Sequence, residues 1–149
     1  MPLPTLRAGL VGYGFAGQTF HAPVLSAVPG LELAAVSSTQ PHKVHSDWPG
    51  VDVVPDVDAL LRRTDIDMVV IAAPNAQHHP LAKAALIAGK HVIVDKPFTL
   101  DATQARELAA LARYSRYYLG KRVSRARGRE ATDDFNSRPV TARSSSPTA

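Results

Sequence analysis

A strand that runs straight into a glycine-rich turn limits this chain to few folds. Residues 6–11 are mostly apolar and lead directly into Gly12-Tyr13-Gly14-Phe15-Ala16-Gly17, which has the spacing G-x-G-x-x-G. In that context the first glycine permits a tight turn, the second lets the backbone approach a pyrophosphate, and the third lets the following helix pack on the strand. The free N–H groups of the helix then face the anion. The motif predicts a dinucleotide-binding site, and the alternative is a glycine-rich turn without a ligand.

Strand-like and helix-like segments alternate over residues 1–119, which favours an α/β fold with a doubly wound parallel sheet, the Rossmann fold that binds NAD(P). Apolar runs predict strands at 6–11, 31–38, 51–54, 67–73 and 91–94. Helical patterns begin near Ala16 and cover 56–63, 77–88 and 101–116, whereas 39–49 is a polar loop or irregular helix. We expect Pro23 to break or kink the first helix, and Asp101 to cap the last one with Gln104. The leucines expected to pack inward from the helices at 56–63 and 101–116 are Leu60, Leu61, Leu100, Leu108 and Leu111.

The basic charge of the chain is confined to its end. Residues 1–119 hold 10 Lys and Arg against 10 Asp and Glu, whereas residues 120–149 hold 7 against 3 and so carry the whole net charge of +4. This end has six Arg, five Ser and one Phe without periodicity, and it cannot bury enough apolar surface to offset its ordering entropy. We expect a dinucleotide-binding domain over residues 1–119 and a disordered basic tail over residues 120–149.

Several classes of protein are disfavoured by what the sequence does not contain. There is no cysteine, so disulfides and sulfur ligands for a metal are excluded, and no metal site is expected. The N-terminal Met1-Pro2-Leu3-Pro4 has no basic leader, and no apolar run approaches the roughly 18 residues that span a bilayer. We expect a cytoplasmic protein without membrane contact.

The residues after the second expected strand indicate which dinucleotide is bound. An NAD-preferring site usually has an acidic residue here for the ribose hydroxyls. This chain has Ser38 and Thr39, with no carboxylate before Asp47, and Lys43 is close in sequence. Hydroxyls and an ammonium group suit a 2′-phosphate, so we expect NADP to be preferred over NAD. The alternative is that these are ordinary loop and surface side chains.

Two further motifs follow strands that end at the same edge of the expected sheet. Pro74-Asn75-Ala76-Gln77-His78 follows the fourth strand, where Pro74, Asn75 and His78 are candidates for contact with the ribose or nicotinamide end of the cofactor. Asn75 could instead cap the next helix. Asp95-Lys96-Pro97 follows the fifth strand. The Lys96 ammonium could polarise a carbonyl or hold a hydroxyl, or simply pair with Asp95 at the surface.

Together these motifs resemble the glucose–fructose oxidoreductase / inositol dehydrogenase (Gfo/Idh/MocA) family, over roughly residues 5–118. The resemblance rests on Gly12–Gly17, Pro74-Asn75-x-x-His78, and Gly89-Lys90-His91-Val92 leading to Asp95-Lys96-Pro97. Thr19-Phe20-His21-Ala22-Pro23 and Asp47-Trp48-Pro49 are similar to a bacterial branch of uncharacterised oxidoreductases within it. The resemblance implies cofactor contacts at Gly12, Gly14, Phe15, Ala16, Gly17, Ser38, Asn75 and His78.

The same resemblance implies an NAD(P)-dependent oxidoreductase that acts on a small sugar or polyol-like substrate. In the family's E-K-P motif the lysine sits between cofactor and substrate, which makes Lys96 the candidate catalytic residue and places Asp95 beside the cofactor. Here Asp95 replaces the family's glutamate and is one methylene shorter.

The family also has a second α/β domain that supplies the substrate pocket and most association between subunits. Residues 120–149 do not resemble it and look like an out-of-frame translation. We therefore expect a truncated or frameshifted product, impaired in catalysis and not oligomeric.

A second function class stays open: a non-enzymatic NADP(H)-binding module whose basic tail touches an acidic partner or nucleic acid. Seven cations without interleaved aromatic residues predict only non-specific, salt-sensitive attraction to nucleic acid.

Overall fold

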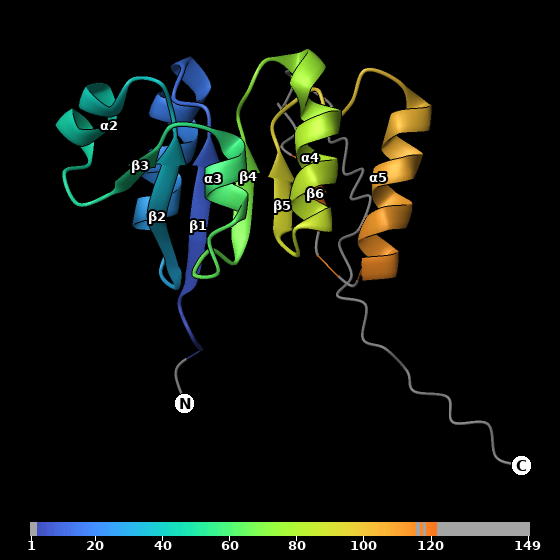
Figure 1. Cartoon of the computed structure of the whole chain (residues 1–149), viewed down its shortest axis with the longest axis horizontal. Coiled ribbons are helices and arrows are strands. Elements are labelled where there is room, and N and C mark those ends of the chain that lie inside the picture. Colours follow the sequence, from blue (N-terminus) through green and yellow to red (C-terminus); the bar gives the residue numbers. More distant parts are fainter. Residues whose placement is uncertain (1–2, 116, 118, 122–149) are drawn as a thin grey trace, which may run out of the picture.

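A six-stranded parallel sheet with the strand order β3-β2-β1-β4-β5-β6 forms the centre of the molecule (Figure 1). The computed structural model describes residues 3–115, 117 and 119–121. The strands are β1 (Leu6–Val11), β2 (Leu31–Ser37), β3 (Asp52–Val54), β4 (Met68–Ile71), β5 (His91–Val94) and β6 (Leu119–Lys121). This order reverses between β1 and β4, so their carboxyl ends form the switch point at which doubly wound sheets bind ligands. The predicted fold class is confirmed.

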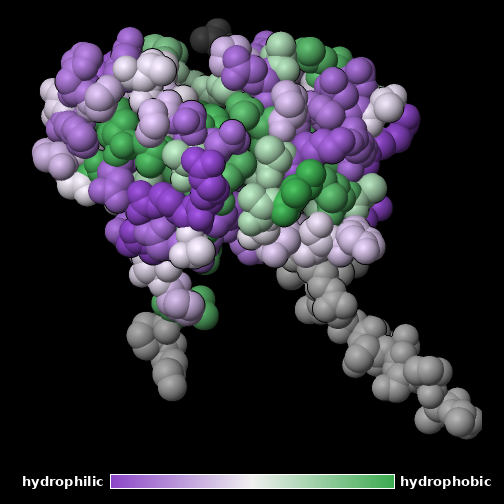
Figure 2. Space-filling view, in the orientation of Figure 1, coloured by the Kyte–Doolittle hydropathy of each residue, from purple (hydrophilic) through white to green (hydrophobic). Residues whose placement is uncertain are grey.

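Helices cover the sheet from both sides, and each side has its own core. Helices α3 (Val57–Leu61), α4 (His78–Ile87) and α5 (Ala102–Ser115) lie in front of the sheet in Figure 1, and α1 (Ala22–Ala27) lies behind it. Leu60, Leu86 and Leu108 are fully buried in the front core. The core on the other side includes Leu25 of α1 and Val44 of α2 (Pro41–Asp47). The face of the molecule shown in Figure 2 is largely hydrophilic, with smaller hydrophobic areas.

The first helix differs from the expectation that Pro23 would break or kink it. It begins as a π-helical turn, η1 (Gly17–His21), in which the Ala22 N–H donates to the Gly17 carbonyl. Pro23 is then the second residue of α1. A proline in the first turn of an α-helix loses no hydrogen bond, so the wide turn before it lets the chain continue helically.

Other differences concern short or polar segments. The polar residues 39–49 contain a regular helix, α2, because Val44 packs into the core with no exposed surface. Residues 119–121 form β6, which pairs with β5, so regular structure extends two residues past the expected boundary at 119. The expected disorder of the tail falls, from residue 122 on, outside the described residues.

The start of α5 confirms the predicted cap. The Gln104 N–H donates to Asp101 Oδ1 at 2.8 Å, and Gln104 Oε1 accepts from the Leu100 N–H at 3.3 Å. Leu108 is fully buried and Leu111 packs against the core. Leu100 was expected on the packing face, but 61% of it is exposed, because it precedes the helix and lies outside its periodic face.

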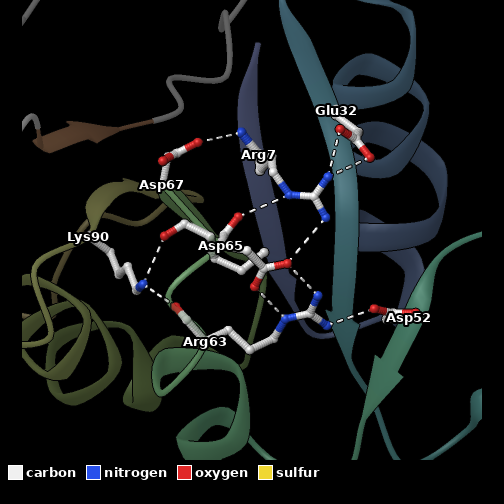
Figure 3. Close-up of polar contacts among 8 residues, drawn as sticks. Arg7, Glu32, Asp52, Arg63, Asp65, Asp67 and Lys90 are labelled. Atoms are coloured by element: carbon white, nitrogen blue, oxygen red, sulfur yellow. Dashed lines mark hydrogen bonds and ion pairs between the residues drawn. The ribbon is translucent and has the colours of Figure 1, made fainter. Parts of the chain in front are cut away.

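Charged side chains tie the amino edge of the sheet together (Figure 3). The Arg7 guanidinium contacts both Glu32 carboxylate oxygens, at 3.0 and 2.9 Å, and its Nε donates to the Asp65 carbonyl at 3.0 Å. Arg63 binds the Asp65 carboxylate in bidentate fashion, at 2.9 and 2.8 Å. The Arg63 guanidinium holds the pKa of that carboxyl well below its usual range. The network fixes the loop between α3 and β4 against β1 and β2.

Lys90 fastens the same loop from the other side. It is 6% exposed, and its ammonium donates to the carbonyls of Arg63, at 2.5 Å, and Ile66, at 2.8 Å. Burial lowers the pKa of the Lys90 ammonium. The lysine of Gly89-Lys90-His91-Val92 therefore has a structural task at the edge opposite the glycine turn (Figure 3).

Lys90→Met should lower the free energy of unfolding by about 1–3 kcal/mol, because two carbonyls lose a charged donor that a thioether cannot replace. Methionine also removes the desolvation cost of a buried ammonium group, but this gain offsets only part of the lost stability. Urea denaturation measures it, with Lys83→Met as the control. Lys83 pairs with Glu107 at the surface, so its removal should cost no more than about 1 kcal/mol. Equal effects of the two substitutions would contradict the assignment.

Candidate functional site

A cleft of about 820 Å³ opens at the carboxyl edge of the sheet. The loops after β1, β2, β3 and β4 form its walls. Its lining residues include Gly12, Tyr13, Gly14, Ser38, Thr39, Gln40, Lys43, Asp56, Val57, Pro74 and Gln77. Predicted site residues from three separate segments are thus brought to one cavity: Gly12, Gly14, Ser38, Thr39, Lys43 and Pro74. The other predicted residues are not among its lining residues: Phe15, Ala16, Gly17, Asn75, His78, Asp95 and Lys96.

The glycine turn is shaped by very close backbone approaches. Gly12 has φ +92°, and a Cβ there would lie 2.7 Å from the Ala72 carbonyl oxygen. A Cβ on Gly17 would overlap the Gly12 carbonyl oxygen. By contrast, a Cβ on Gly14 would meet nothing within 4 Å. The first and third glycines are therefore required by the chain itself, whereas the second faces open space at the cleft.

The wall after β2 carries hydroxyl groups and one ammonium group. Thr39 is exposed, and the Ser38 hydroxyl oxygen accepts from the Gln40 N–H at 3.0 Å. The Lys43 ammonium donates to the Tyr13 carbonyl at 3.1 Å and lies 5.7 Å from the centre of the Tyr13 ring. Lys43 is thereby fixed between the glycine turn and the end of β2.

Asp47, the carboxylate at the end of α2, is hydrogen-bonded to residues of the glycine turn and of η1. The Tyr13 hydroxyl donates to Asp47 Oδ2 at 2.7 Å, and Gln18 Nε2 donates to the same oxygen at 2.9 Å. These hydrogen bonds lower the pKa of Asp47, whereas burial, together with the Asp47 contact, raises the pKa of Tyr13 to about 12. Asp47 stays charged at neutral pH, but its Oδ2 is occupied by the donors of Tyr13 and Gln18.

A carboxylate that the sequence analysis passed over also lines the cleft. Asp56 follows β3 and caps α3, where its Oδ1 accepts from the Ala59 N–H at 2.7 Å. The sequence did contain a signal for Asp56, because it follows a short apolar strand and a proline. The carboxyl ends of parallel strands lie at one edge of the sheet, so a residue in this position is expected near the cleft.

The loop after β4 contains one exposed and one buried candidate. Asn75 is exposed and lies within a short 3₁₀ helix, η2 (Asn75–Gln77), so its side chain caps neither this helix nor α4. His78 is 1% exposed, with Nδ1 2.5 Å from the Pro97 carbonyl and Nε2 2.8 Å from the Ala73 carbonyl. His78 therefore ties the loops after β4 and β5 together, and direct contact with a cofactor stays a prediction.

The loop after β5 presents Lys96. Asp95 is 6% exposed, and its Oδ1 accepts from the Lys96 main-chain N–H at 2.8 Å. Its Oδ2 lies 3.3 Å from His21 Nε2. The alternative of a surface ion pair between Lys96 and Asp95 is not observed, because Asp95 binds the lysine's backbone. Lys96 is exposed, and its ammonium has no hydrogen-bond partner among the described residues.

Phe15 and Ala16 complete the set of predicted residues. Phe15 is 75% exposed and its ring packs edge-on against Phe20, with centroids 5.6 Å apart. Ala16 immediately precedes η1. Within the part of the chain that the structure describes, no group of three His, Asp or Glu side chains could hold a metal ion. No helix in the same part is long and apolar enough to cross a membrane.

The strand order, the glycine turn and the cleft define a dinucleotide-binding domain of the Rossmann type. The family model described as "Oxidoreductase family, NAD-binding Rossmann fold" (GFO_IDH_MocA) matches residues 6–120. The chain belongs to this family, which confirms the resemblance seen in the sequence.

The relatives that this chain matches are longer than the chain. The uncharacterized oxidoreductase YdgJ of Escherichia coli is 52% identical over 130 residues, which cover 87% of this chain and 36% of YdgJ. The scyllo-inositol 2-dehydrogenase (NADP(+)) IolW of Bacillus subtilis is 29% identical over 72% of this chain and 30% of its own length. The chain thus spans about a third of these relatives.

A solved structure shows the same fold. KijD10, a 3-ketoreductase from Actinomadura kijaniata in complex with NADP and TDP-benzene, aligns with TM-score 0.75 and 32% identity. The alignment covers 78% of this chain and 37% of KijD10.

Gly17→Ala should lower the free energy of unfolding by about 1–3 kcal/mol, as overpacking does. Alanine is ordinarily better than glycine in a helix by about 1 kcal/mol, so the sign of the change is diagnostic. Gly14→Ala is the matched control and should change stability by less than about 0.5 kcal/mol, because its methyl group meets open space. Thermal and urea unfolding of both variants measure these changes. A Gly17→Ala protein more stable than the unaltered chain would contradict the close contact between Gly17 and the Gly12 carbonyl.

Proposed function

We propose that this domain binds NADP(H) in the carboxyl-edge cleft and is the cofactor-binding part of an oxidoreductase. The observation that carries the proposal is the glycine turn at the β1/β4 switch point, with open space beside Gly14 where a pyrophosphate would lie. The Gly12 N–H donates to the Ser37 carbonyl, so the donors for that anion would be N–H groups at the start of the helix that follows the turn. On this proposal, Gly12, Gly14, Phe15, Ala16 and Gly17 hold the pyrophosphate.

The two walls of the cleft fit the two ends of the cofactor. The adenosine end would lie against the loops after β2 and β3, which line the cleft with Ser38, Thr39 and Asp56. The nicotinamide end would then lie toward the loops after β4 and β5, near Asn75 and Lys96. Bound NADP(H) supplies the hydride chemistry.

Lys96 has the role of the group that touches the reacting oxygen. Its ammonium is exposed at the carboxyl edge and has no partner among the described residues, so it is free to donate to an incoming oxygen. Such a donor stabilises negative charge that develops on a carbonyl oxygen during reduction, or orients a hydroxyl for oxidation. Asp95 contributes by holding the Lys96 backbone rather than by contacting its ammonium.

The substrate class that we propose is a small sugar or polyol. Hydride transfer with a nicotinamide cofactor interconverts a hydroxyl-bearing carbon and the corresponding carbonyl, while a lysine ammonium contacts the oxygen. The names of IolW, an inositol dehydrogenase, and KijD10, a 3-ketoreductase, support this class. In the longer relatives, the region beyond the matched third would supply the opposite wall of the substrate site.

A preference for NADP over NAD is supported by the charges at the end of β2. Ser38, Thr39 and Lys43 line the cleft there, and Asp47 is turned toward Tyr13 and Gln18. A 2′-phosphate would meet hydroxyls and a fixed ammonium group, which form charge-assisted hydrogen bonds with phosphate. The IolW name and the KijD10 complex both specify NADP.

Gly14→Val tests the pyrophosphate site. The added side chain would occupy the open space next to the turn, so NADPH affinity in calorimetric titration should fall at least about tenfold, or 1.4 kcal/mol. Gly50→Val is the matched control, since a Cβ at Gly50 also meets nothing within 4 Å and Gly50 does not line the cleft. Unchanged affinity in a folded Gly14→Val protein would place the phosphates elsewhere.

Lys43→Gln tests the cofactor preference. Removing a charged donor to a phosphate should weaken NADPH binding about tenfold or more, since such bonds contribute about 1.5–3 kcal/mol. NADH lacks the 2′-phosphate, so its affinity should stay within about twofold. Lys83→Gln, on the outer surface of α4, controls for the loss of one positive charge. Tighter binding of NADH than NADPH by the unaltered chain would overturn the preference.

A further inference from the structure

The motif Thr19-Phe20-His21-Ala22-Pro23 contributes a largely buried imidazole that the proposed function does not use. His21 is the last residue of η1, and its side chain is 11% exposed. Its Nε2 is fully buried and has no well-aligned hydrogen bond among the described residues. The Asp95 carboxylate lies close to it, with Oδ2 3.3 Å from Nε2. The two atoms are within ion-pair distance without the direction of an ideal hydrogen bond.

Asp95 stands between His21 and the turn that carries Lys96. Its side chain is 9% exposed, and a buried carboxylate is costly unless polar groups surround it. One of its oxygens accepts from the Lys96 main-chain N–H at 2.8 Å, while the other faces His21. The carboxylate therefore links the helix after the glycine turn to the backbone of Lys96.

We propose that His21 is a positioning residue for Lys96 and acts through the Asp95 carboxylate. The inference rests on the proposed function, because Lys96 is there the group that meets the substrate oxygen. His21 reaches Asp95 from the helix that follows β1, on one side of the sheet. His78 holds the Pro97 carbonyl from α4, on the other side. Lys96 thus stands on a turn that is held immediately before and after it.

Fixing this turn matters because a lysine side chain is long and flexible. The ammonium of an exposed lysine samples many rotamers, and the position of its backbone limits where the ammonium can go. A displacement of about 1 Å at a reacting centre can cost about a hundredfold in rate. A buried imidazole that sets the carboxylate, and through it the Lys96 N–H, would restrict that displacement.

The first test observes Lys96 directly and needs no cofactor. The 149-residue chain has five lysines, so ¹³C labelling of lysine gives few Cε signals, and the Lys96 signal is assigned by its loss in Lys96→Arg. We expect His21→Leu to shift the Lys96 signal and leave that of Lys83 in place. His21→Gln, whose amide can still donate to Asp95, should restore the original position. An unchanged Lys96 signal in His21→Leu, or no restoration by His21→Gln, would overturn the inference.

If His21→Leu fails to fold, all lysine signals move to nearly the same chemical shift. His21→Asn then replaces His21→Leu in the experiment. Its amide corresponds to the Nδ1 side of the ring and does not reach Asp95, so the Lys96 signal should shift as for leucine. An Asn variant that leaves the signal unmoved would overturn the inference.

The second test asks whether His21 acts through Lys96 on the bound cofactor. We expect His21→Leu to weaken NADPH binding about threefold to tenfold and to leave the affinity for 2′,5′-ADP, which lacks the nicotinamide, within about twofold. In a Lys96→Met background the same substitution should have no further effect, because coupled residues are not additive. Additive losses would mean that His21 is only structural. Failure of the unaltered chain to bind NADPH would refute the proposed function, whereas the lysine signal would still decide the role of His21.

Discussion

The approach of Gly17 to the Gly12 carbonyl is the contact on which the carboxyl edge depends. With no side chain at position 17, the helix after β1 can begin directly against the end of the strand. That start places the Gly14 backbone at the mouth of the cleft and carries His21 toward Asp95. The glycine spacing therefore determines more than a phosphate cradle, because it also fixes the distance between the first helix and the turn after β5.

The positively charged side chains discussed at the two edges of the sheet differ in whether they have partners. At the amino edge, the guanidinium groups of Arg7 and Arg63 and the ammonium of Lys90 each have carboxylate or carbonyl partners (Figure 3). At the carboxyl edge, the exposed Lys96 ammonium has no partner within the described part of the chain. At the amino edge these paired charges hold loops, whereas the unpaired Lys96 ammonium is available to a ligand. Two lysines from adjacent family motifs therefore have different surroundings: Lys90 is buried and donates to carbonyls, whereas Lys96 is exposed.

The sequence predicts this fold well where apolar runs are bounded by turn residues, and less well where packing alone decides. Strands β1 and β5 have the expected limits, because continuous apolar runs are typical of buried parallel strands. Helix α2 lies among polar residues, and although Pro41 at its start is a helix signal, the burial of Val44 that stabilises it is visible only in the structure. The ring contacts of His21 and His78 join segments far apart in the chain. No local pattern encodes such contacts, so the sequence could name these residues by resemblance but not say what they touch.

The shorter acid at position 95 is best understood together with His21. The family's E-K-P motif has a glutamate where this chain has Asp95, and one extra methylene adds roughly 1.5 Å of reach. Asp95 Oδ2 already lies 3.3 Å from His21 Nε2, so a longer side chain in the same direction would press into the imidazole. A glutamate would have to turn away, and its carboxylate would then leave either the imidazole or the Lys96 N–H. Residues 21 and 95 therefore form one unit, in which the length of the aspartate side chain fits the space in front of the imidazole.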